Sequence, residues 1–145
     1  MELLQTVHSY LAYVALAVLF IAVANAILGL MKDRMFTLEK DFRISLFALI
    51  IVHLQLILGV ILYFVSASGY SAISQFGMGG LTPAARLLAL EHPLINIIAI
   101  ALITVGWSRH KKFMEGKKKF RSIALFYGLG LLLIMSRIPW AQWFN

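Results

Sequence analysis

Three histidines lie in or at the edge of long apolar stretches of this 145-residue sequence: His8, His53 and His92. An ionisable side chain is costly inside an apolar span and usually faces the interior of a helix bundle. Such residues mark a bound cofactor, a proton path or a substrate site. The fourth histidine, His110, lies among basic residues, and we expect it to be a solvated loop residue.

No metal-binding motif joins these histidines in the sequence, so a site must be assembled across helices. Two neutral imidazoles on different helices can bind the iron of haem b from opposite faces, inside apolar walls that exclude water. The sequence contains no cysteine. Disulfides, thiolate metal sites and covalent haem attachment through paired cysteines are therefore excluded.

The elements that must position the histidines are four apolar stretches. The sequence is 61% hydrophobic and 13% charged, its mean hydropathy is +0.88, and soluble domains are roughly 45–50% apolar. Each stretch is close to the length of about 20 residues that crosses a bilayer. We predict an all-α, single-domain integral membrane protein, an antiparallel four-helix bundle with spans at 3–31, 44–67, 84–107 and 122–140.

Local signals refine these elements. Thr82 and Pro83 have the chemistry of an N-cap and a first helical residue, so a helix should begin there. Residues 66–80 contain four glycines and should form a flexible loop. Pro93 cannot donate a helical hydrogen bond and should disturb its helix. We expect small residues in the spans to serve helix contact: Asn25, Gly29, Gly59, Gly106, Gly128 and Gly130.

Basic residues give the orientation. The connections at 32–43 and 108–121 hold all but two of the 13 Lys and Arg residues, so both should face the cytoplasm of a bacterial inner membrane. Both termini should then lie on the outer, periplasmic side. The net charge of +7 is explained by these topology signals, and we expect no nucleic-acid partner. The run 109–121 could also bind anionic lipid or an acidic partner, although topology alone accounts for it.

Height in the membrane favours one pair of histidines. His8 and His92 lie about five and about eight residues from the outer starts of parallel helices, a mismatch of roughly 5 Å. His53 lies roughly 21 Å from the outer end of an antiparallel helix. If the helices close in sequential order, the first and third are diagonal and leave room for a flat macrocycle. We therefore prefer His8 with His92 as ligands and keep His53 as the alternative ligand.

Two arginines and one glutamate lie near the same height in the membrane as the preferred histidine pair. Arg86 and Arg137 are the only basic residues on the outer side and could pair with haem propionates, or they could anchor helix ends. Glu91 could orient a histidine from another helix, relay protons, or pair with one of the arginines. Gln55 does not point toward His53, because neighbouring helical residues diverge.

With these residues placed, the sequence resembles a family of small four-span bacterial membrane proteins commonly labelled cytochrome b. The matching stretches are His8-Ser9, VHLQLILG at 52–59, LYF at 62–64, Glu91-His92, ITVGWSR at 103–109 and IPW at 138–140. The resemblance runs almost end to end. It implies bound haem b. We therefore expect a b-type cytochrome that passes single electrons to or from a quinone or a partner membrane protein.

A weaker resemblance is to a half-domain of haem A synthase. It is carried by residues 54–59, Ser68-Gly69, Arg86-Leu87 and His92. That resemblance implies that His92 ligates haem near the outer surface, with His8 as its partner by helix order. The alternatives to an electron carrier are therefore a haem- or quinone-modifying enzyme and a cofactor-free accessory subunit of a membrane complex.

Overall fold

The computed structural model describes residues 2–143, and these residues form helices with no strand among them. The chain runs through α1 (Glu2–Met31), a π-helical turn η1 (Leu38–Phe42) and α2 (Arg43–Val65). A π-helical turn η3 (Leu87–Glu91) leads into α5 (His92–Lys112), and α6 (Gly116–Ser136) follows. Four helical stretches of the described chain are long and apolar enough to cross a membrane.

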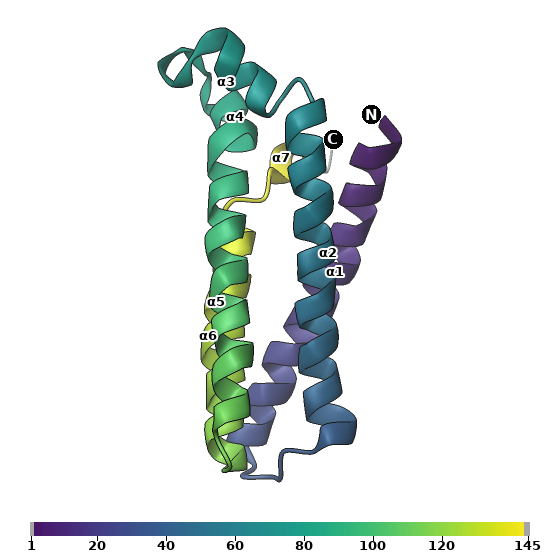
Figure 1. Ribbon diagram of the computed structural model, residues 1–145, viewed down its shortest axis with the longest axis vertical. Coiled ribbons are helices and arrows are strands. Elements are labelled where there is room, and N and C mark those ends of the chain that lie inside the picture. The colour runs from purple at the N-terminus through teal and green to yellow at the C-terminus, as the bar shows by residue number, and fades with distance from the viewer. Residues whose placement is uncertain (1, 144–145) are drawn as a thin grey trace.

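Neighbouring long helices meet in the order of the sequence. Contacts join α1 to α2, α2 to α5, α5 to α6 and α6 back to α1. Helices α1 and α5 therefore occupy opposite corners, as do α2 and α6. Figure 1 shows the start of α1, α7 (Trp140–Trp143) and α3 (Tyr70–Phe76) at one end, here called the terminal end. The connections 32–37 and 113–115 lie at the other end, here called the basic end.

Small residues allow the helices to pack closely. A Cβ at Gly106 would lie 2.5 Å from the Cβ of Phe126, and one at Gly130 would lie 2.6 Å from Ile103. Gly29 approaches Phe120 as closely. The expected contact role is thus confirmed for these three glycines, because no larger side chain fits without displacing a neighbour. Gly128 is looser, since a Cβ there would lie 3.8 Å from the nearest atom of Val23.

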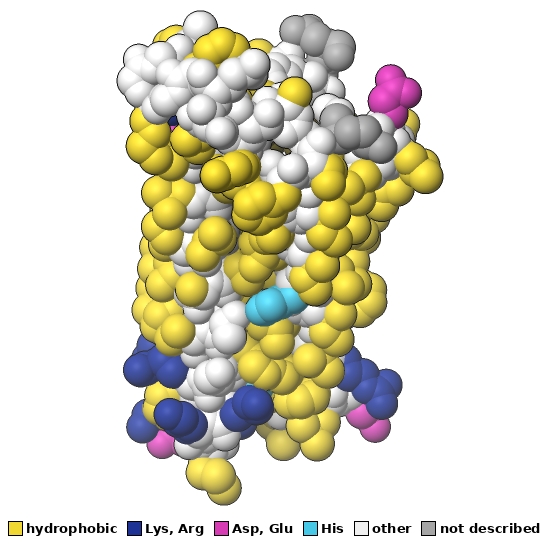
Figure 2. Space-filling model, turned by 45° about the horizontal axis from the view of Figure 1, so that its top comes forward, with side chains coloured by type: hydrophobic (Ala, Val, Ile, Leu, Met, Phe, Trp, Pro, Cys, Tyr) yellow, Lys and Arg dark blue, Asp and Glu magenta, His cyan; other side chains and the backbone are white. Residues whose placement is uncertain are grey.

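The outer surfaces of the long helices are apolar. Figure 2 shows hydrophobic side chains over most of the face between the two ends, with Lys and Arg gathered at the basic end. Large hydrophobic residues from every long helix are exposed, among them Phe20, Ile57, Leu94 and Leu132. A face of this kind is typical of a membrane-spanning protein, in which lipid replaces water.

The bounds of α5 and α6 differ from those of the predicted spans. Helix α5 continues through the basic residues to Lys112, and α6 begins at Gly116 rather than at residue 122. Basic residues are good helix formers, so helix persists beyond the apolar window. Helix α6 ends at Ser136, before the predicted end at residue 140, because Pro139 disfavours helix in the residues just before it.

The connection at 66–80 is more ordered than the expected flexible loop. It contains α3 and a 3₁₀ turn, η2 (Met78–Gly80). Ala72 of α3 packs with Leu81 and with Ala89 of η3, and this apolar contact holds the short helix across the terminal end. The expected N-cap is confirmed: the Thr82 hydroxyl accepts a hydrogen bond from the amide of Ala85 in α4 (Pro83–Arg86).

Candidate cofactor site

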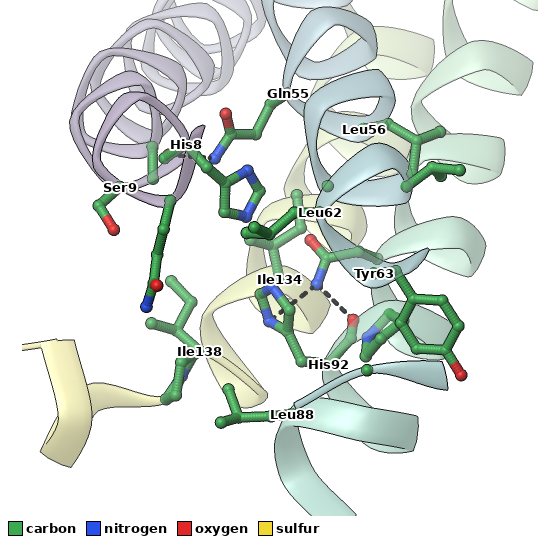
Figure 3. Close-up of a pocket in the computed structure, with 18 of the residues that line it drawn as sticks. His8, Ser9, Gln55, Leu56, Leu62, Tyr63, Leu88, His92, Ile134 and Ile138 are labelled. Atoms are coloured by element: carbon green, nitrogen blue, oxygen red, sulfur yellow. Dashed lines mark hydrogen bonds between the residues drawn. The ribbon is translucent and has the colours of Figure 1, made fainter. Parts of the chain in front are cut away.

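A cavity of about 1140 Å³ opens between the long helices in their half near the terminal end. It exceeds the roughly 300–1,000 Å³ of ordinary ligand clefts. Its walls come from α1, α2, η3, α5 and the end of α6, and they are mostly apolar. Its polar lining residues include His8 on α1, Gln55 on α2, and His92 and Asn96 on α5. Figure 3 shows His8 and His92 within it, between Gln55, Leu62 and Ile134.

The structure brings the two preferred histidines together. The ring centroids of His8 and His92 lie 6.4 Å apart, and the ring planes are nearly perpendicular, at 85°. An imidazole nitrogen lies roughly 2 Å from a metal ion that it binds, so two imidazoles on opposite sides of one ion have centres roughly 6 Å apart. The observed separation is therefore close to that of two axial ligands sharing one metal.

The ring of His92 is held from the end of α6. Its Nδ1 lies 3.0 Å from the backbone carbonyl oxygen of Arg137. A carbonyl oxygen only accepts hydrogen bonds, so this contact is a hydrogen bond in the tautomer that carries its proton on Nδ1 and leaves the lone pair on Nε2. The side-chain nitrogen of Asn96 lies 3.2 Å from the same Nδ1 and would donate to it in the other tautomer. The side-chain amide of Asn96 donates to the carbonyl oxygen of His92 at 2.6 Å. Metal-binding histidines typically donate a hydrogen bond through one ring nitrogen to a carbonyl oxygen and keep a free lone pair on the other ring nitrogen.

His8 is held against α2 at a glycine. A Cβ at Gly59 would lie 3.2 Å from Cε1 of His8, so only glycine leaves full space for the ring there. The side-chain amide of Gln55 donates to the backbone carbonyl of His8 at 2.8 Å and ties α1 to α2. Both Nδ1 of His8 and Oε1 of Gln55 are buried without a hydrogen-bond partner among the described residues. Buried polar atoms without a partner are rare in folded proteins.

His53 lies outside this cavity. Its Nδ1 donates to the carbonyl oxygen of Leu49 at 2.7 Å, and its Nε2 lies 3.3 Å from the hydroxyl of Thr104 on α5. Both ring nitrogens are thus engaged by protein groups. This arrangement favours the interpretation of His53 as a polar link between α2 and α5, and it leaves the cavity pair without a third histidine.

Glu91 pairs with both outer arginines. Its carboxylate lies 3.0 Å from Nε of Arg86 and 3.5 Å from Nε of Arg137. Of the three roles left open for Glu91, pairing with an arginine is the one observed, and it involves both arginines. Neither arginine lines the cavity. The backbone of Arg137 nevertheless reaches it indirectly, because its carbonyl oxygen holds His92. A role of the two side chains toward propionates stays a prediction.

The break expected near Pro93 takes the form of a π-helical turn. In η3 the amide of His92 donates to the carbonyl oxygen of Leu87, one residue further back than in an α-helix. Such turns rotate the residues that follow and are frequent at functional sites. The turn immediately precedes His92 and sets the direction in which its side chain leaves α5.

The expectation that His110 is solvated is wrong. The side chain is fully buried, with its ring 4.6 Å from that of Trp107 and 5.5 Å from that of Phe36. Its Nδ1 donates to the carbonyl oxygen of Trp107, and its Nε2 has no hydrogen-bond partner in the described chain. Burial follows because α5 continues past the predicted span and the connection 32–37 folds over this face.

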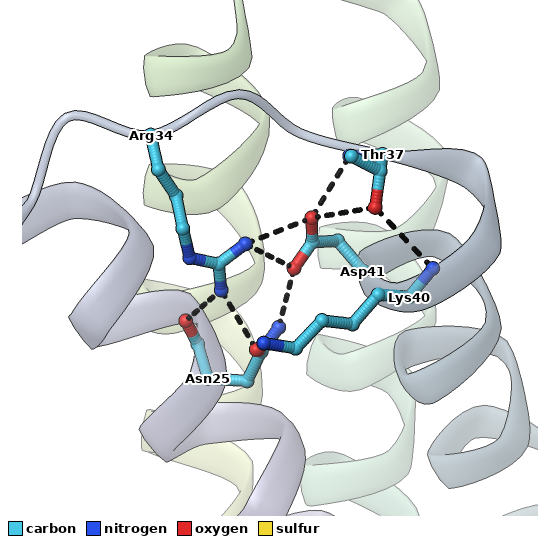
Figure 4. Close-up of polar contacts among 5 residues, drawn as sticks. All are labelled: Asn25, Arg34, Thr37, Lys40 and Asp41. Atoms are coloured by element: carbon cyan, nitrogen blue, oxygen red, sulfur yellow. Dashed lines mark hydrogen bonds and ion pairs between the residues drawn. The ribbon is translucent and has the colours of Figure 1, made fainter.

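A buried polar network lies at the basic end and was not predicted from the sequence. Arg34 donates to both carboxylate oxygens of Asp41, at 2.9 and 3.1 Å, and to the side chain of Asn25 at 2.8 Å (Figure 4). Asn25 and the amide of Thr37 also donate to the fully buried Asp41, each at 2.8 Å. Asn25 thus holds the α1–α2 connection rather than serving plain helix contact. A lone asparagine in an apolar span was the available signal.

Comparison of the chain with protein-family models, curated proteins and solved structures found no match. Among the described residues, no group of three or more His, Asp or Glu side chains is arranged to hold a metal ion. A bis-histidine haem needs only two protein ligands, and the cavity offers that number.

Proposed function

We propose that this chain is a membrane b-type cytochrome, an antiparallel four-helix bundle that binds haem b between His8 and His92 and transfers single electrons. The observation that carries the proposal is the 6.4 Å separation of the two imidazole rings inside a large apolar cavity. The sequence resemblance to small four-span cytochrome b proteins points to the same cofactor. Bound haem supplies reversible one-electron chemistry at its iron.

The residues of the chain contribute binding and orientation. His8 and His92 would each offer one imidazole nitrogen, and the carbonyl oxygen of Arg137 would orient the His92 ring through Nδ1. Gly59 gives the His8 ring its place against α2. The apolar side chains around the pair exclude water, and a low local polarity tunes the potential of a haem.

The propionates would emerge toward the terminal end. Arg86 and Arg137 share a single carboxylate, Glu91, so the trio keeps one net positive charge there. That charge favours an anionic group close by. Gln5, Thr6, Ser9 and Gln142 line the cavity and add neutral hydrogen-bonding groups, beside one carboxylate, Glu2.

The basic end would face the cytoplasm, and both termini would face the periplasm of a bacterial inner membrane. This orientation places the connections 32–37 and 113–115, with their flanking Lys and Arg residues, on the inner side. The haem would then lie in the outer half of the bilayer. A quinone dissolved in the membrane, or a partner membrane protein, would exchange the electron.

One specific feature favours a second candidate, a haem- or quinone-modifying enzyme. The cavity is larger than ordinary ligand clefts and contains the unpartnered Oε1 of Gln55. Such a site could hold a substrate beside a cofactor. Turnover of added haem or quinone, followed by mass spectrometry of the extracted products, separates this candidate from an electron carrier.

The absorption spectrum of the protein tests the main proposal. Protein expressed with ample haem and purified in detergent should show, after reduction, the sharp α and β bands of a six-coordinate, low-spin haem, because two imidazoles impose a strong ligand field. Protein that carries no haem under these conditions would overturn the proposal. A quinone-modifying enzyme and a cofactor-free accessory subunit would then remain.

A further inference from the structure

A second, smaller hollow lies at the basic end, between the end of α5 and the start of α6. Its volume is about 200 Å³. Three cationic residues line it, Arg109, Lys118 and Arg121, together with the apolar residues Phe113, Leu125 and Phe126. No residue of this hollow belongs to the cofactor cavity.

The back of the hollow is a fixed contact between the two helices. The hydroxyl of Ser122 on α6 donates to the carbonyl oxygen of Gly106 on α5 at 2.9 Å. At the same place a Cβ on Gly106 would lie 2.5 Å from Phe126, so the helices touch directly. Residues on either side of this contact keep a constant spacing, because neither helix can slide without breaking it.

Aromatic rings hold two of the cations beside the hollow. The guanidinium of Arg109 lies 5.7 Å from the ring centroid of Phe126, and Nζ of Lys118 lies 5.9 Å from that of Phe113. The nearby carboxylate of Glu115 is 3.8 Å from Lys118, and both side chains are well exposed, so this pair neutralises little. The described residues that line the hollow include no carboxylate.

We propose that this hollow binds the headgroup of one anionic phospholipid, with its phosphate among Arg109, Lys118 and Arg121. The site lies where α6 passes from basic residues to an apolar face, and Leu125 is 53% exposed just below the cations. A phospholipid fits both the cationic part and the apolar part of the hollow, since its phosphate would lie among the cations and its acyl chains along Leu125 and Phe126. An acidic protein segment would leave that apolar half uncovered. The proposal rests on the membrane placement proposed above and is independent of haem.

The test counts phospholipid molecules retained by the protein. Native mass spectrometry of the full chain, released from bilayers of mixed phosphatidylglycerol and phosphatidylcholine, should show selective retention of one phosphatidylglycerol. The triple variant Arg109→Gln, Lys118→Gln, Arg121→Gln should lower its affinity about a hundredfold, since each cation near the surface contributes roughly fivefold. The variant Arg109→Lys, Arg121→Lys should keep most of the affinity.

The matched control removes three charges from the other connection at the same end. Lys32→Gln, Lys40→Gln, Arg43→Gln changes the net charge equally but leaves the hollow intact, so retention should match that of the unaltered protein. Equal loss in both triple variants would show a general charge effect and overturn the site. Displacement of the lipid by millimolar inorganic phosphate would show a site for free anions and would also overturn it. The α bands of the haem, if present, should be unchanged in every variant.

Discussion

The imidazole rings of His8 and His92 face the same cavity with their centroids 6.4 Å apart, although α1 and α5 occupy opposite corners of the four-helix arrangement. Because the backbones of diagonal helices do not pack against each other, the space between them is free for a flat group. His53, in contrast, bonds to Leu49 and Thr104 and joins neighbouring helices.

The first prediction concerns the ligands. His92→Ala should abolish haem binding or weaken it severely, because the residue with the free Nε2 is removed. His8→Ala should do the same or leave a five-coordinate, high-spin species visible in the absorption spectrum. His53→Ala is the matched control and should retain the low-spin spectrum. If His53→Ala removes a ligand while His8→Ala has no effect, α2 and α5 hold the haem and the diagonal pair does not.

The second prediction concerns the space beside His8. Gly59→Leu should reduce haem retention at least tenfold, because a Cβ at this position already lies 3.2 Å from the ring and a longer side chain must displace it. Gly128→Leu places the same residue at a glycine with far looser surroundings. Titration of haem into the purified apoprotein measures both variants. Equal affinities would mean that Gly59 does not position His8.

The third prediction concerns Glu91. Its pairing with Arg137 fixes the segment whose carbonyl oxygen accepts from Nδ1 of His92. Glu91→Gln should raise the midpoint potential of the haem, since a weaker hydrogen bond makes the imidazole a poorer donor and a negative charge is lost. Arg86→Gln breaks only the other ion pair and should shift the potential downward. Redox titration followed at the α band gives both values, and a shift in the same direction for both would contradict this role.

The helical spans and the convergence of His8 with His92 were predictable because both follow from periodic, local quantities. Apolar length determines how many helices are long enough to span, and the rise per residue gives the height of each histidine. Pairing of Glu91 with an arginine was one of three roles that the sequence left open, and it could be named because all three residues lie at one level. The irregularity before α5 could be predicted from Pro93, but its form could not. A proline indicates a disturbed helix without specifying a π-helical turn such as η3.

The burial of His110 and of Asp41 could not be predicted from the sequence. Both depend on how the connection 32–37 folds back, and its sequence, three charged residues followed by Met35, Phe36 and Thr37, does not specify that path. Asp41 is satisfied by Asn25 of α1 and by Arg34 and Thr37 of the connection. Hydropathy counts Asp41 as a charge that should face water, whereas in the structure its carboxylate is buried in an ion pair and hydrogen bonds.

The fourth prediction concerns the stability of this network. Asp41→Ala should lower the free energy of unfolding by about 3 kcal/mol, because Arg34 and Asn25 lose their common partner in a largely buried site. Glu39→Ala removes an exposed carboxylate from the same turn and should cost less than about 0.5 kcal/mol. Denaturation in detergent followed by circular dichroism measures both. The haem spectrum of either folded variant should be unchanged, since the network lies at the end opposite to the cavity.

The last prediction concerns orientation in the membrane. The chain has no cysteine, so a single cysteine introduced at any position reports that position alone. Gly79 lies in η2 at the terminal end and Lys118 lies near the start of α6 at the basic end. A membrane-impermeant maleimide added to intact spheroplasts should label Gly79→Cys and miss Lys118→Cys, because an excess of Lys and Arg keeps connecting segments in the cytoplasm. Both variants should react fully after detergent is added, which controls for accessibility of the thiols. The opposite labelling pattern would place His8 and His92 in the inner half of the bilayer, and any electron exchange would then occur on the cytoplasmic side.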